Sequence, residues 1–138
     1  MNESQSRISE RGQSGRSLGP RSRFRLERLR GDPIAYALVE RIARQRRISM
    51  RDLLQRRRGT GSAALTRQLA MYLVHVLLSR PQDVIGELFD RERTTVSYAV
   101  MRIEALRDED PAIDAEIAGI EAEGWGVLRE SAGARNAA

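Results

Sequence analysis

The sequence predicts an all-α fold: a compact bundle of about six helices that contains a helix-turn-helix, with a disordered basic N-terminal arm. Apolar residues recur at helical spacing, and no alternating strand pattern interrupts them. The pairs Asp32-Pro33 and Asp110-Pro111 each combine a helix-capping residue with a proline at the first helical position. Residues 1–31 are rich in Ser, Gly and Arg and poor in apolar side chains, which favours disorder over most of this segment, and only FRLERL, residues 24–29, could form a short nascent helix.

Each expected helix follows a capping residue and carries an apolar face. The first runs to about Arg46, and the second is short and opens at Ser49. Ser62 is predicted to cap the third, whose wide apolar face is typical of the central helix of a core. Ser79 and Gln82 are spaced as a capping box for the fourth.

The fifth and sixth helices complete the expected domain. A turn at residues 90–93 precedes the fifth helix, and the sixth covers about residues 111–123. The inward-facing residues of the fifth helix are Val96, Ala99, Val100, Ile103 and Leu106. The predicted organisation is an arm over residues 1–31, a folded domain over 32–123 and a flexible tail over 124–138.

Composition points to a polyanionic partner. The chain has 138 residues and a net charge of +5, and all 24 basic residues are arginine. The absence of cysteine excludes disulfides, zinc fingers and thiol catalysis, and the absence of lysine excludes a Walker A loop and Schiff-base chemistry. No catalytic constellation, cofactor motif or metal-ligand spacing is present, so we expect a protein that is not an enzyme.

Residues 1–31 contain no apolar stretch that fits a signal peptide, and the sequence has no apolar run of 18 residues. We therefore expect a cytoplasmic, nucleoid-associated protein with no membrane partner and no small-molecule substrate. The positive charge lies before residue 108, because residues 108–138 hold two arginines and eight acids.

Residues 65–106 carry the pattern most informative about function. They read as a long apolar helix, a short helix, a tight turn and a helix that opens on RERTTV. That order is a helix-turn-helix, the arrangement that places one helix in the major groove of DNA. Basic and polar residues gather at the start of the last helix, which predicts double-stranded DNA as the partner.

The run from TRQLAMYL through VIGELF to RERTTVSYAVMRI resembles the C-terminal DNA-binding domain of the bacterial replication initiator DnaA. The family reads roughly P-R-Q-x-A-M-Y-L, then I-G-x-x-F, then G-G-R-D-H-T-T-V-x-H-A-x-x-K-I. The preceding IAYALVERIARQRRISMRDLLQRRR is similar to the family's lead-in, so the resemblance covers about residues 32–123. Because the chain is short and has no lysine, we expect a stand-alone DNA-reading module without the initiator's ATPase module.

The resemblance implies that the start of the fifth helix meets base edges in the major groove. Arg93 can fork onto guanine, and Glu92 can either accept a hydrogen bond from cytosine or cap the helix. Thr94 and Thr95 offer methyls to thymine and hydroxyls to phosphates, or merely cap the helix. The turn is one residue shorter than in the family, and Arg93 stands in place of a histidine, so the target sequence need not be the family's.

The resemblance also implies contacts outside the major groove. Arg57 or Arg58 would enter the minor groove, because Gly59 falls on the position of the family's arginine. The alternative is that these arginines are only a solvated charge run. The expected phosphate contacts are Arg56, Ser62, Arg67, Gln68, Gln82 and Arg91.

Three other features have structural interpretations. The single histidine, His75, lies between core positions and has no ligand partner in sequence, so we interpret it as a boundary residue. The acids at 108–110 are interpreted as a solvated helix end rather than a metal site. Trp125 and the acidic sixth helix offer a packing surface or a docking surface for a protein partner.

These observations leave three functions open. The first is a sequence-specific transcriptional regulator. The second is a replication modulator that competes for origin sites resembling those of DnaA, and Arg93 argues against identical sites. The third is a protein-interaction module that has lost DNA reading, which the basic start of the fifth helix disfavours.

Overall fold

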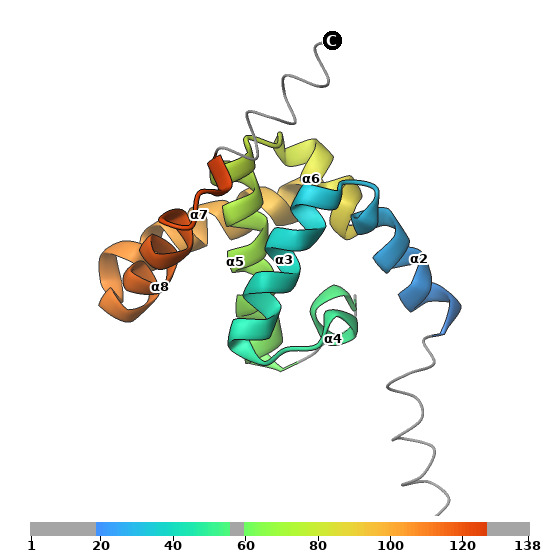
Figure 1. Ribbon diagram of the computed structural model, residues 1–138, viewed down its shortest axis with the longest axis horizontal. Coiled ribbons are helices and arrows are strands. Elements are labelled where there is room, and N and C mark those ends of the chain that lie inside the picture. The colour runs from blue at the N-terminus through green and yellow to red at the C-terminus, as the bar shows by residue number, and fades with distance from the viewer. Residues whose placement is uncertain (1–18, 56–59, 127–138) are drawn as a thin grey trace, which may run out of the picture.

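The computed structural model describes residues 19–55 and 60–126, and within them the only regular elements are α-helices (Figure 1). The predicted all-α fold class is therefore confirmed. The helices are α2 (Pro20–Arg30), α3 (Pro33–Arg46), α4 (Met50–Leu54), α5 (Gly61–Leu78), α6 (Gln82–Phe89), α7 (Arg93–Glu109) and α8 (Pro111–Glu121).

The core is built around α5, as the sequence predicts. Every residue from Leu69 to Val74 is buried, so this helix is covered on all sides over that stretch. It packs most extensively against α7 and α3, and α3 lies beside it through the centre of the molecule (Figure 1). Val96, Ala99, Val100 and Ile103 of α7 are buried against it, as expected for the inward face of that helix.

The expectation of disorder up to residue 31 is wrong for Pro20–Arg30, which form α2. Leu26 and Leu29 are buried on the core, and α2 packs beside α3, α4 and α6. The apolar signal in this arginine-rich segment is mainly these two leucines, so its composition resembles that of a disordered arm. Burial against other helices overrides composition here. Residues 1–18 lie outside the described residues.

Two of the predicted helix caps are wrong. Thr60, rather than Ser62, caps α5, and its Oγ1 accepts a hydrogen bond from the Ala63 amide at 3.1 Å. Ser79 is not part of a capping box, because it ends α5 in the left-handed conformation with φ 56°. Pro81, which has no side-chain acceptor, stands at the N-cap position of α6 instead.

Asp32 caps α3 as predicted and also makes a long-range contact. Its Oδ1 accepts from the Ala35 amide at 3.2 Å, and its Oδ2 accepts from Arg80 Nε at 2.6 Å. Asp32 therefore joins the start of α3 to the link between α5 and α6. Burial by itself would raise the pKa of this carboxyl, but the hydrogen bonds from Arg80 and Ala35 outweigh burial and hold the pKa below its ordinary value.

Asp32→Ala is expected to lower the free energy of unfolding at pH 7 by about 1–2 kcal/mol, because it removes both a helix cap and an ion pair. Asp32→Asn should cost less, since Asn also caps helices. The folded pKa lies below the unfolded value of about 3.9, so the stabilisation is complete above that pH and is lost as pH falls through the folded pKa. Denaturant unfolding at pH 7 and in strong acid measures it, and a difference undiminished in acid would contradict the role of the charge.

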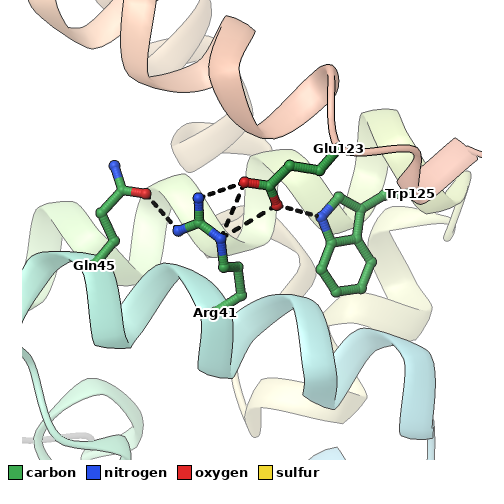
Figure 2. Close-up of polar contacts among 4 residues, drawn as sticks. All are labelled: Arg41, Gln45, Glu123 and Trp125. Atoms are coloured by element: carbon green, nitrogen blue, oxygen red, sulfur yellow. Dashed lines mark hydrogen bonds and ion pairs between the residues drawn. The ribbon is translucent and has the colours of Figure 1, made fainter.

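The segment after α8 is fastened to α3 (Figure 2). Arg41 Nε donates to both carboxylate oxygens of Glu123, at 3.2 and 3.1 Å, and Trp125 Nε1 donates to Glu123 Oε1 at 3.0 Å. The hydrogen bonds from Arg41 and then from Trp125 lower the pKa of Glu123. Trp125 is partly buried and packs on the core. This agrees with its interpretation as a packing residue.

The acids of α8 are neutralised within the chain. Arg46 binds Glu116 through two hydrogen bonds of 2.9 Å. Arg107 contacts Asp114 at 2.7 Å and Glu121 at 3.3 Å. Each acid of this helix is already paired. The expected docking of a protein partner on α8 stays a prediction, and such a partner would have to compete with these ion pairs.

Candidate nucleic-acid interface

The link between α6 and α7 is a tight turn that depends on Gly86. The Arg91 amide donates to the Gly86 carbonyl at 2.8 Å, and the Asp90 amide donates to Glu87 O at 3.3 Å. Asp90 ends α6 in the left-handed conformation with φ 55°. A Cβ placed on Gly86 would lie 2.7 Å from the Arg91 carbonyl oxygen, which is closer than real Cβ contacts allow. Only glycine therefore permits this close approach of the turn to α6.

The first residues of α7 are exposed to solvent, and buried residues follow them in the helix. Glu92, Arg93, Thr94 and Thr95 are all exposed, whereas the next residue, Val96, is completely buried. Glu92 occupies the N-cap position, but its side chain makes no capping hydrogen bond, so the carboxylate stays available at the surface. The four residues predicted to read bases are thus brought together on one exposed turn of helix.

Gln82 braces α7 against α6. The Ser97 hydroxyl donates to Gln82 Oε1, which joins the first turn of α6 to the second turn of α7. The expected phosphate contact of Gln82 would have to use its amide nitrogen. Gln68 is partly buried on α5, and Ser62 is exposed in the first turn of the same helix.

Two other predicted phosphate residues hold the end of α4. Arg67 Nη1 donates to the Leu53 carbonyl at 3.0 Å, and Arg91 Nη2 donates to the Gln55 carbonyl. These carbonyls belong to the last turn and C-cap of α4, where the helix leaves them without partners of its own. Arg67 and Arg91 therefore tie α4 to α5 and to the α6–α7 turn. Burial lowers the pKa of Arg67, which still carries its charge at neutral pH.

The predicted minor-groove residues Arg57 and Arg58, together with Arg56, lie outside the described residues. Gln55 immediately precedes them, and its carbonyl is the group that Arg91 binds.

Sequence reasoning missed two exposed side chains on α7. Tyr98 and Met101 are 59% and 70% exposed, although both are large and partly apolar. They lie one and two helical turns beyond Thr94 on the same face. Their spacing from Thr94 in the sequence already places them on the face of α7 that carries Thr94.

Arg67→Ala is expected to reduce the free energy of unfolding by about 1–2 kcal/mol, because a half-buried hydrogen bond to a helix end is lost. Its affinity for all duplexes should fall by one common factor, since the family resemblance implies that Arg67 contacts phosphate rather than a base. Thermal unfolding and titration with two unrelated duplexes measure both effects. A changed base preference would contradict this placement.

A short helix, a glycine-dependent turn and an exposed basic and polar helix start on a buried scaffold together define a helix-turn-helix DNA-binding domain. Residues 36–103 match the family model described as the bacterial dnaA protein helix-turn-helix. The chain therefore carries a helix-turn-helix domain of the bacterial DnaA type, as the sequence resemblance predicted.

Curated relatives agree with this assignment. Over 77 residues the chain is 44% identical to the chromosomal replication initiator protein DnaA of Bradyrhizobium sp. (strain ORS 278). It is 43% identical over the same length to the proteins of that name from Rhodopseudomonas palustris (strain BisA53) and Nitrobacter hamburgensis. The aligned part is 55% of this chain and 16% of each relative, so the similarity concerns one region of those proteins.

No helix within the described residues has both the length and the apolar character needed to cross a membrane.

Proposed function

We propose that the protein is a bacterial transcriptional regulator that binds specific sites on double-stranded DNA. The observation that carries this proposal is the exposed turn from Glu92 to Thr95, which stands on the buried residues of α7. Groove-reading helices need such an arrangement, because the buried part of the helix fixes the position of the side chains that meet the DNA bases.

In this proposal Arg93 forks onto a guanine and Glu92 accepts from a cytosine amino group. Thr94 and Thr95 contact thymine methyls or the backbone. The phosphate contacts in this proposal are Arg56, Ser62, Arg67, Gln68, Gln82 and Arg91. Of these, Arg67 and Arg91 also hold the end of α4. Arg57 or Arg58 enters the minor groove.

A second candidate function is modulation of replication initiation at origin sites. It is favoured by the relatives of this region, which are named chromosomal replication initiator proteins. Arg93 stands where the family pattern has histidine, which favours sites that differ from the family's.

Genome-wide occupancy in the native cell separates the two candidates. A transcriptional regulator gives discrete peaks at promoters and altered transcript levels when the protein is removed. Peaks confined to the replication origin, with a changed ratio of origin to terminus DNA, would instead establish the replication modulator. Uniform occupancy without peaks would contradict both.

A further inference from the structure

The α6–α7 segment is acidic, which is unfavourable next to DNA. From Gln82 to Arg93 the chain has four acids, Asp83, Glu87, Asp90 and Glu92, against two arginines. By itself, this segment would place net negative charge beside the exposed start of α7. Phosphates would be repelled from that edge of the interface unless other charges compensate.

Arginines of α2 lie against this acidic segment. Arg28 Nε donates to the Glu87 carbonyl at 2.7 Å, and Arg25 Nε lies 3.6 Å from Asp90 Oδ2. Arg21 lines a shallow hollow together with Arg25 and Asp90. The three arginines are spaced i, i+4 and i+7, so they share the face of α2 that packs beside α6.

The same face reaches the proposed reading residues. Arg28 and Arg93 line one hollow at the α6–α7 turn. Arg25 is mostly buried, with 14% of its side chain exposed, so it acts on Asp90 rather than on solvent. Arg21 is exposed and is the member of the set that can reach a ligand. With these three charges the acidic edge becomes positive.

The buried leucines of α2 fix this helix on the core. Leu26 is 8% exposed and Leu29 is fully buried, so the helix is anchored on the core and its arginines are held beside the turn. This helix precedes residues 36–103, the part that matches the DnaA-type family model. Its contribution is therefore additional to the helix-turn-helix itself.

We infer that the basic face of α2 completes the DNA interface. This inference rests on the proposed DNA binding. Arg25 and Arg28 neutralise the acidic turn, and Arg21 binds a backbone phosphate beside the bases that α7 meets. Arg25 and Arg28 are positioning residues in this account, and Arg21 is the contact residue.

The test uses the full chain, a duplex selected from a random pool and an unrelated duplex of equal length. Arg21→Ala should weaken both complexes by one common factor and reduce the slope of log affinity against log salt by about one. Arg25→Gln should weaken binding several-fold, and adding Asp90→Asn should restore it. Asn tolerates the left-handed backbone at position 90, so this second change removes the charge without opposing the turn.

Arg23→Ala is the matched control, because Arg23 is exposed on α2 and loses the same charge away from this face. Equal effects of Arg21→Ala and Arg23→Ala would overturn the inference. So would a failure of Asp90→Asn to restore Arg25→Gln when thermal unfolding finds both chains folded. If the unsubstituted chain prefers no duplex, the proposed function itself fails. If it prefers the selected duplex and the α2 variants bind DNA as tightly as the unsubstituted chain does, only this inference fails.

Discussion

Arg93→Ala is expected to relax base preference at one position of the binding site and to cost about 1–3 kcal/mol of binding free energy on the preferred duplex. The reason is that a guanidinium can give guanine two parallel hydrogen bonds that alanine cannot replace. Arg93 is exposed at the first position of α7, so its removal leaves the core intact. Competition binding with duplexes that differ at single base pairs measures the effect.

Two further variants separate charge from base contact. Arg93→Lys keeps the charge but not the fork, so base preference should fall while the salt dependence is retained. Arg102→Ala removes the same charge from an exposed position further along α7, and base preference should be unchanged. If Arg93→Ala preserves the full preference, the start of α7 is not the base-reading element.

Gly86→Ala is expected to lower the free energy of unfolding by about 1–3 kcal/mol, as overpacking of a tight site does. The new methyl would lie 2.7 Å from the Arg91 carbonyl oxygen and 3.6 Å from the Arg93 amide nitrogen. Because both are backbone atoms, the turn itself has to move. DNA affinity should fall with stability, since the turn sets the direction of α7.

Gly119→Ala is the matched control for this prediction. Gly119 is an exposed position within α8, and no atom lies within 4 Å of an added Cβ. Alanine should therefore stabilise the chain by roughly 0.5–1 kcal/mol through helix propensity. The two glycine substitutions are expected to have opposite signs in denaturant unfolding. A neutral Gly86→Ala would contradict the account of the turn.

The helical scaffold was predictable because its signals are local. Asp32-Pro33 and Asp110-Pro111 start α3 and α8 as predicted, since a cap followed by proline depends on neighbouring residues alone. The wide apolar face of α5 likewise identified the central helix. The exposed start of α7 also follows from local pattern, because polar residues precede a regular apolar stripe.

The features that were missed depend on distant contacts. α2 is longer than the nascent helix considered at residues 24–29, because Leu26 and Leu29 pack on the core. An arginine-rich composition does not reveal that packing. The spacing of Ser79 and Gln82 fitted a capping box, yet Gln82 instead accepts from Ser97. Likewise, Arg67 and Arg91 were expected only at phosphates, whereas the structure shows each bound to a carbonyl at the end of α4. Spacing in sequence could not indicate those carbonyls.

Selection of duplexes from a randomised pool by the full chain tests the central claim most directly. The account predicts a short enriched motif that includes a guanine, and the loss of preference at that guanine when Arg93→Ala is selected in parallel. A pool that stays random, although the chain is folded and binds DNA, would contradict sequence-specific reading by α7.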